Sequence, residues 1–268
     1  MIKPYYETEL GKLYHGDCLE ILPQLTERVD LVLTSPPYDN LRDYNGYSLD
    51  FHGIANALYE SMVVGGVMVW VVGDATVNGS ETGTSFKQAL YFKEIGFNLH
   101  DTMIYLKNQL AFPDDNRYYN AFEYMFVFSK GKPKSFNPIK DRKNVSVGRD
   151  VHGNERKKNG ELRKNRACAG NIISEYGVRW NYWLIYNQAR GIQTQHPAIF
   201  PDRLAQDHIL SWTNPGDLVI DCFSGSGTTA VACERLGRRW IGIEISKEYC
   251  DIAVKRIEQE RSQLNLSL

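Results

Sequence analysis

The sequence predicts an α/β fold with several buried strands. Its clearest apolar runs, each about as long as a buried strand, lie at residues 29–34, 67–72, 124–128 and 217–221. From residue 217 onward, a strand, a glycine-rich loop, a helix and a second strand follow in direct succession, which is typical of α/β proteins. A chain of 268 residues with 43% hydrophobic residues can form one large domain of this class, with or without an insertion.

The composition is that of a soluble globular protein. No apolar run approaches the roughly 18 residues that a membrane-spanning helix needs. The opening stretch, MIKPYYETELGK, contains no apolar core of the kind that signal peptides carry. We therefore expect a cytoplasmic protein.

Cysteine and histidine usage argues against disulfides and metal sites. The five cysteines are odd in number and form no CxxC pair, so we expect reduced thiols and no zinc site. No metal-ligand spacing relates the histidines considered as ligands, which are His15, His52, His100 and His208.

A rigid corner follows the first apolar run, in the stretch LVLTSPPYDN at residues 31–40. Proline fixes its own φ, lacks an N–H and forces the preceding residue into extended geometry. Ser35-Pro36-Pro37-Tyr38 therefore neither continues strand pairing nor begins a helix at once, and its hydroxyls and carbonyls point away from the sheet. Taken alone, the stretch is also compatible with an ordinary Pro-Pro turn.

The glycine-rich unit near the carboxyl end is the second informative stretch. We expect a strand at 217–221, a loop at 223–229, a helix at 229–236 that ends at Gly237, and a strand at 240–245. Glu244 lies 19 positions after Gly225, which is the spacing expected when a carboxylate binds ribose hydroxyls.

Different nucleotide-like ligands use such a unit. A phosphate-binding loop of nucleoside triphosphate hydrolases needs a Lys after its last glycine, and none follows Gly227. Residues 225–230 do satisfy the G-x-G-x-x-A pattern of dinucleotide sites, so an NAD-dependent oxidoreductase stays open on this motif alone.

Two motifs together carry a family resemblance. The pattern Asp-x-Phe-x-Gly-x-Gly-Thr-Thr at 221–229, with the TSPPY corner at 34–38, resembles the S-adenosylmethionine-dependent DNA methyltransferases that modify exocyclic amino groups. The corner precedes the glycine-rich loop, so the motif order is similar to that of the circularly permuted β group. The resemblance implies a Rossmann-like methyltransferase fold, with a seven-stranded, mainly parallel sheet, one antiparallel strand and helices on both faces.

Further stretches extend the resemblance along the chain. They are LYHGDCLEILPQL, GGVMVWVVGD, FEYMFVFSKG and HPAIFPDRLAQDHILSW. The resemblance implies a catalytic half at 1–130, a basic target-recognition insertion at 131–195 and a cofactor-binding half at 196–268. The two halves form one domain.

The resemblance also implies roles for individual residues. Ser35 and the main-chain carbonyl of Pro36 accept the two amino hydrogens of a flipped base, Pro37 helps to hold the corner, and Tyr38 stacks on the base. Glu244 holds the ribose hydroxyls of S-adenosylmethionine, and Asp17 its adenine amino group. The other expected cofactor-binding residues are Thr34, Asp221, Phe223, Ser224, Gly225, Ser226, Gly227, Thr228 and Thr229. Cys222 is expected to be a packed thiol.

Positive charge is concentrated in one segment. Residues 131–190 contain 14 Lys or Arg against 5 Asp or Glu, a net +9, whereas the remainder has 17 against 27, a net −10. A solvated loop and a surface for nucleic-acid phosphates both fit this charge, and the aromatic residues that follow could be core or could line a groove. The residues expected to contact double-stranded DNA are Arg156, Lys157, Lys158, Arg163, Lys164, Arg166 and Trp180.

The target base and the partners follow less directly. In the family that the chain resembles, Asp in the first position of the corner mostly accompanies adenine-N6 and Ser mostly cytosine-N4, so Ser35 favours cytosine-N4 with adenine-N6 as the alternative. A glutamine-modifying protein methyltransferase typically has Asn there and the unpermuted order. A catalytically silent DNA-binding protein would keep only the basic segment. The resemblance also implies a possible homodimer and a possible companion restriction endonuclease.

Overall fold

The computed structural model describes residues 2–37, 49–107, 115–151, 154–164, 171–186 and 201–266. The chain divides into two compact units, one formed by Met1–Asn137 with Asn181–Leu268 and the other by Pro138–Trp180. The first unit contains the main sheet and its helices. Within the described residues, no helix is both long and apolar enough to cross a membrane.

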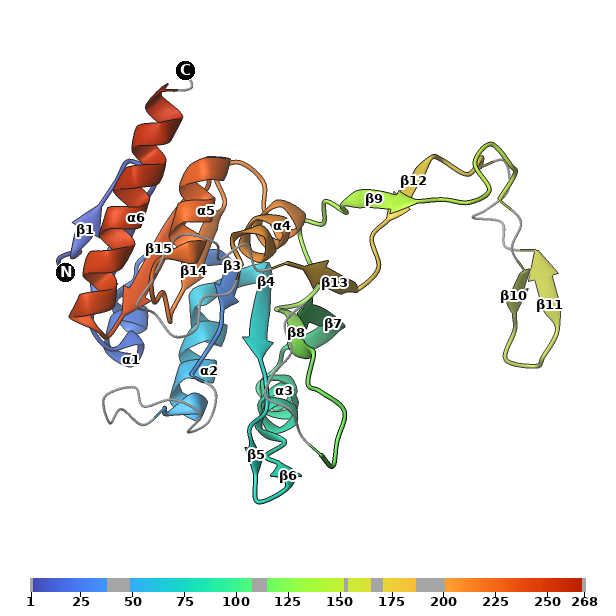
Figure 1. The fold of residues 1–268 in the computed structure, drawn as a ribbon, viewed down its shortest axis with the longest axis horizontal. Helices are drawn as coiled ribbons and strands as arrows, with labels where there is room; N and C mark the ends of the chain where they lie inside the picture. The colour runs from blue at the N-terminus through green and yellow to red at the C-terminus, as the bar shows by residue number, and fades with distance from the viewer. Residues whose placement is uncertain are drawn as a thin grey trace. The chain divides into compact units, whose positions relative to one another are not determined.

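Within the described residues, nine strands form the main sheet (Figure 1). In spatial order they are β1 (Tyr6–Glu7), β2 (Gly11–His15), β15 (Arg239–Glu244), β14 (Leu218–Asp221), β3 (Val29–Thr34), β4 (Met62–Val72), β8 (Phe122–Ser129), β7 (Asn98–Lys107) and β13 (Tyr182–Ile185). Strand β8 is antiparallel to both its neighbours and β1 is antiparallel to β2, whereas all other pairs are parallel. The predicted α/β class is confirmed.

The strand number differs from the seven expected. Seven strands, from β2 to β7, form the body of the sheet, and one strand is added at each edge. β1 is a two-residue edge strand, and β13 comes from residues that the sequence analysis placed in the basic insertion. Its parallel pairing with β7 joins segments far apart in the chain, which local sequence patterns do not report.

Helices cover both faces of the sheet. They are α1 (Cys18–Ile21), the 3₁₀ helix η1 (Leu22–Gln24), α2 (Phe51–Ser61), α3 (Thr84–Glu94), α4 (Asp202–Trp212), α5 (Thr228–Leu236) and α6 (Lys247–Leu266). Alternate residues of β4 enter two separate cores: Val69 packs with residues of α4, α5 and α6, and Trp70 with residues of α1, α2 and α3. This alternation explains why the strand reads as a continuous apolar run.

The sheet has a topological switch point between β14 and β3, where the strand order reverses. From β14 the chain runs through α5 to β15 on one side, and from β3 it runs through α2 to β4 on the other. Open α/β sheets bind ligands in the crevice beyond the carboxyl ends of such a strand pair. The permuted order does not separate the pair, since Leu31 is paired with Val219 and Val32 with Ile220.

The second unit contains short antiparallel ribbons. β9 (Lys140–Lys143) pairs with β12 (Tyr176–Val178), and β10 (Asn154–Arg156) pairs with β11 (Leu162–Lys164). Its charged sequence without an apolar period thus forms paired strands with most side chains exposed. One further hairpin, β5 (Thr76–Val77) with β6 (Ser80–Glu81), belongs to the first unit.

Candidate active site

Four neighbouring parallel strands bring the predicted site residues to one edge of the sheet. Asp17 follows β2, Glu244 ends β15, Asp221 ends β14, and Ser35 follows β3. The first two strand ends are tied directly, because the N–H of Gly16 donates to the Glu244 carbonyl at 2.9 Å. Three carboxylates therefore lie at the carboxyl ends of consecutive strands, beside the Ser-Pro corner.

Asp221 links the corner to the glycine-rich loop. The hydroxyl of Thr34 donates to Asp221 Oδ1 at 2.6 Å, and the hydroxyl of Thr229 donates to Oδ2 at 2.7 Å. The Phe223 N–H also donates to Oδ1, at 3.1 Å. The three side chains of Thr34, Asp221 and Thr229 are buried, so their polar atoms bond to one another, and any contact with a cofactor falls to their main chain. Burial raises the pKa of Asp221, against the effect of these donors.

The glycine-rich loop bends sharply before α5. Gly225 and Gly227 both have positive φ, 51° and 80°, a conformation that L side chains rarely adopt. The loop folds back on β15, because the Ser224 N–H donates to the Ile243 carbonyl at 2.9 Å. The side chains of Ser224, Ser226 and Thr228 are buried, and Phe223 is half-buried. The predicted loop and helix are thus found within one residue of their expected bounds.

Glu244 holds the loop from the neighbouring strand. Its Oε2 accepts from the Gly225 N–H at 2.7 Å, and its Oε1 accepts from the Ser246 N–H at 2.8 Å. The residue is buried, and this burial raises the pKa of its carboxyl above the usual value of 4.5. A carboxylate oxygen has more than one acceptor direction, so Glu244 retains acceptor capacity for a ligand hydroxyl.

Asp17 begins α1 as its N-cap. Its Oδ1 accepts from the Leu19 N–H at 2.8 Å, which is the capping role that a short polar residue commonly has before a helix. The residue is half-buried at the carboxyl end of β2, and a carboxylate has more acceptor directions than the Leu19 N–H alone occupies.

The Ser-Pro-Pro corner leaves β3 directly after the buried Thr34. Pro36 is buried, while Ser35 and Pro37 are half-buried. Tyr38, the predicted stacking residue, lies outside the described residues. The nearby Cys222 is fully buried, and burial raises the pKa of its thiol well above 9.0, which fits the expected packed thiol. Among the described residues, no cluster of His, Cys, Asp and Glu could hold a metal ion.

The predicted DNA-contacting residues lie in the second unit. Arg156, Lys157, Lys158 and Arg163 are exposed on or beside the β10–β11 hairpin, whose turn includes an ion pair from Lys157 to Glu161 at 3.0 Å. The side chain of Lys164 and all of Arg166 lie outside the described part of the chain. Trp180 is 53% exposed, and the Arg142 guanidinium lies 4.3 Å from its ring centroid. The sequence analysis missed Arg142, because only the β9–β12 pairing brings it to that ring.

Trp183 has a different environment from Trp180. It is buried on β13 and packs in the core beside α4. Of the two readings left open for this aromatic stretch, core applies to Trp183, whereas Trp180 remains on a surface.

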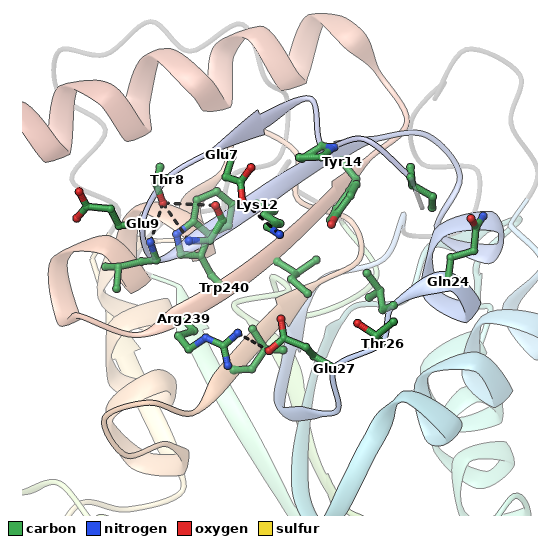
Figure 2. A pocket seen from close by; sticks show the side chains of 17 residues that line it. Glu7, Thr8, Glu9, Lys12, Tyr14, Gln24, Thr26, Glu27, Arg239 and Trp240 are labelled. Atoms are coloured by element: carbon green, nitrogen blue, oxygen red, sulfur yellow. Dashed lines mark hydrogen bonds and ion pairs between the residues drawn. The ribbon is translucent and has the colours of Figure 1, made fainter.

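A pocket of about 380 Å³ lies at the opposite edge of the sheet (Figure 2). It is lined at the amino ends of β2, β15 and β14, so it is distant from the Ser-Pro corner and the glycine-rich loop. Four of its charged side chains form ion pairs, Lys12 with Glu7 and Arg239 with Glu27, as Figure 2 shows. The chemistry of the site therefore belongs to the carboxyl edge.

Comparison with known proteins agrees with this geometry. The family model for DNA methylases of the N6 and N4 type matches residues 29–255. The orphan methyltransferase M.BamHII of Bacillus amyloliquefaciens is 57% identical over 250 residues, which are 91% of this chain and 90% of that protein.

Solved structures show the same fold. The cytosine-N4-specific PvuII DNA methyltransferase superposes with a TM-score of 0.69 at 25% identity, over 98% of this chain and 94% of that one. The complex of M1.HpyAVI with S-adenosylmethionine superposes with a TM-score of 0.62 at 27% identity, over 92% and 99%. The chain therefore belongs to the S-adenosylmethionine-dependent DNA methyltransferases that modify exocyclic amino groups, in their permuted β group.

Proposed function

We propose that this DNA methyltransferase transfers the methyl group of S-adenosylmethionine to the N4 amino group of a flipped cytosine in double-stranded DNA. The observation that carries the proposal is the position of Ser35-Pro36 at the end of β3, directly beside the β14 end that begins the glycine-rich loop. The likeness to a cytosine-N4-specific enzyme supports the choice of base.

The residues at the carboxyl edge fit the cofactor chemically. S-adenosylmethionine supplies a methyl group on a sulfonium cation, and it carries ribose hydroxyls and an adenine amino group as donors. Glu244 and Asp17 are acceptors with unused lone pairs at neighbouring strand ends, and we assign them to the ribose and the adenine amino group. The glycine-rich loop and Phe223 would surround the methionine part.

The Ser-Pro corner would orient the attacking nitrogen. The lone pair of an exocyclic amino group is delocalised into the ring, so attack requires the nitrogen to become pyramidal. Acceptors at Ser35 and at the Pro36 carbonyl favour that geometry by binding the two amino hydrogens. A serine hydroxyl is a weaker acceptor than a carboxylate, which leaves more of this task to the carbonyl that the prolines hold in place.

Nucleoside analysis tests the choice of base. Plasmid DNA methylated by the purified enzyme is digested to nucleosides and measured by mass spectrometry. We expect N4-methylcytosine as the product. N6-methyladenine as the only modified nucleoside would refute the base assignment and leave the methyltransferase family intact.

The proposals for protein partners concern a companion endonuclease and a second copy of this chain. M.BamHII is named an orphan methyltransferase, and this supports the proposal that the present enzyme acts without a companion endonuclease. A homodimer stays a prediction, to be measured by light scattering of the purified chain with and without DNA.

Replacement of Glu244 should weaken cofactor binding. We expect Glu244→Ala to lose about 1–3 kcal/mol of binding free energy for S-adenosylmethionine, because charge-assisted hydrogen bonds to the ribose and the support of Gly225 both disappear. The raised pKa of Glu244 means that its carboxyl protonates at a higher pH than a free glutamate does. When the pH is lowered, the affinity for S-adenosylmethionine should therefore begin to fall before the pH reaches about 4.5.

Calorimetric titration with S-adenosylmethionine checks both statements. Glu234→Ala is the matched control, because Glu234 is also buried and accepts from the Trp240 indole at 2.8 Å, but on helix α5 away from the loop. Equal affinities in wild type and Glu244→Ala would move the ribose site elsewhere.

We further propose that cations of the segment 156–166 bind the DNA backbone. Arg156, Lys157, Lys158, Arg163, Lys164 and Arg166 are assigned to phosphates, and Trp180 to the groove or a base. Each phosphate contact that releases a counterion steepens the dependence of affinity on salt. The support for this proposal is the net +9 of residues 131–190 and the exposure of the described cations on the hairpin.

The triple variant Lys157→Ala, Lys158→Ala and Lys164→Ala should flatten that dependence. The slope of log affinity against log salt is expected to fall by up to about 0.9 per lost contact, equally for target and non-target duplexes. A triple alanine variant at Lys3, Lys12 and Lys255, outside this unit, serves as the charge-matched control. An unaltered slope in the first variant would mean that these cations are solvated and do not contact the DNA backbone.

A further inference from the structure

Helix α6 lies directly against the glycine-rich loop. A Cβ atom built on Gly227 would come within 2.9 Å of the Cβ of Ala253, so the loop and the helix approach as closely as glycine permits. Ala253 and Arg256 are three positions apart on α6 and therefore share a face. Arg256 therefore lies on the side of α6 that faces the loop.

Arg256 donates to the loop from this position. Its Nη1 lies 2.7 Å from the Ser226 carbonyl, 2.9 Å from the Ser226 hydroxyl and 3.2 Å from the Thr228 hydroxyl. Its Nη2 lies 3.3 Å from Asp202 Oδ1, in the first turn of α4. One guanidinium thus joins the loop to the start of a second helix.

The charge of Arg256 is largely buried, although α6 is rich in charged residues. Only 17% of the Arg256 side chain is exposed, whereas its partner Asp202 is 46% exposed. Burial lowers the pKa of Arg256, but a guanidinium remains protonated in proteins, so its charge must be met by acceptors. Two of the three loop atoms that meet it belong to Ser226, between Gly225 and Gly227.

A glycine-containing loop needs such external support. Glycine loses more backbone entropy on ordering than any other residue, and this loop has two of them on either side of Ser226. Glu244 fixes the first glycine through its N–H, as described above. Arg256 fixes the next residue, Ser226, by donating to its carbonyl.

We propose that Arg256 is a positioning residue that preorganises the glycine-rich loop for S-adenosylmethionine. The inference rests on the proposed placement of the cofactor at this loop. Arg256 does not touch the reacting atoms in this assignment. It holds residues 226–228 in the binding conformation before the cofactor arrives, and its positive charge behind the loop favours the anionic carboxylate of the amino-acid part.

Arg256→Met tests the proposal, because Met keeps an unbranched apolar side chain and removes all four hydrogen bonds. We expect the dissociation constant for S-adenosylmethionine to rise about tenfold, since preorganisation is lost, while the turnover rate at saturating cofactor changes by less than about twofold. Amide hydrogen exchange of residues 224–229 in the cofactor-free protein should accelerate.

Arg235→Met is the matched control. Arg235 on α5 makes two hydrogen bonds to Glu260 on α6, at 2.7 and 2.5 Å, so it also anchors α6 through a guanidinium, but without contacting the loop. It should lower the thermal unfolding temperature and leave both the affinity and the exchange of residues 224–229 unchanged. Asp202→Asn should also keep near wild-type affinity, because the loop contacts of Arg256 remain.

The outcomes separate the proposal from the site on which it rests. Equal cofactor affinities in Arg256→Met and Arg235→Met would overturn the positioning role. If Glu244→Ala also bound normally, the placement of the cofactor would be wrong as well. Should Arg256→Met fail to fold, Arg256→Lys provides the test: an ammonium restores the charge but cannot span both the loop and Asp202, so an affinity between that of wild type and Glu244→Ala is expected.

Discussion

Pro36→Ala is expected to reduce the rate of methyl transfer by one to several orders of magnitude, with the affinity for S-adenosylmethionine nearly unchanged. The proline fixes φ at the residue whose carbonyl we assign to the target amino group, and alanine releases that restraint. Pro36 is buried at the end of β3, so its position is further set by packing. Ser35→Ala should also lower the rate by at least about tenfold, because one of the two acceptors is lost.

The rate should be measured in a single turnover, since product release often limits steady-state rates. Pro215→Ala is the control: Pro215 lies in the turn before β14, at the opposite edge of the sheet, and its replacement releases backbone freedom far from the corner. Wild-type transfer rates in both Ser35→Ala and Pro36→Ala would remove the corner from the mechanism.

Local sequence signals predicted the unit around the glycine-rich loop closely. Asn214-Pro215-Gly216 marks the turn before β14, and Gly237 ends α5 in the left-handed conformation at φ 60°. These boundaries depend on residues within a few positions of each other. The segment after Asp17 shows the same local control, since it divides into α1 and the 3₁₀ helix η1 around Pro23.

Long-range contacts account for what the sequence could not predict. Nothing in the helix α6 sequence, KEYCDIAVKRIEQERSQLNL, distinguishes Arg256 from the other cations of that helix. The side-chain directions of Thr34 and Asp221 likewise depend on the pairing of β3 with β14, across 187 positions of the chain. The sequence placed both residues at the site, but only the folded arrangement brings them to each other.

The Asp221 network predicts the largest effect on stability. Asp221→Ala leaves two buried hydroxyls and the Phe223 N–H without their acceptor, and each such loss costs about 1–3 kcal/mol. We expect the free energy of unfolding to fall by about 2–5 kcal/mol in total, since the three costs overlap. Thr34→Val removes one of the donors at nearly constant volume and should cost less. Chemical denaturation measures both changes.

Asp221→Asn separates hydrogen bonding from charge. The amide oxygen still accepts from Thr34, and the amide nitrogen can donate to the Thr229 hydroxyl, so Asp221→Asn should lose far less stability than Asp221→Ala. The pH dependence then reports the buried charge. Because burial raises the folded-state pKa of Asp221 above the ordinary 3.8, the folded state binds this proton more tightly than the unfolded chain.

Between those two pKa values, lowering the pH therefore stabilises the wild type through this group, and raising the pH through the folded-state pKa removes that contribution. Asp221→Asn has no titratable carboxyl group at this position, so it lacks this contribution. In urea titrations at pH values lowered from neutral toward the ordinary 3.8, the wild type should gain stability relative to Asp221→Asn. A relative loss on acidification would mean that the donors from Thr34, Thr229 and Phe223 outweigh desolvation, and that the ionised carboxylate is the form the fold prefers.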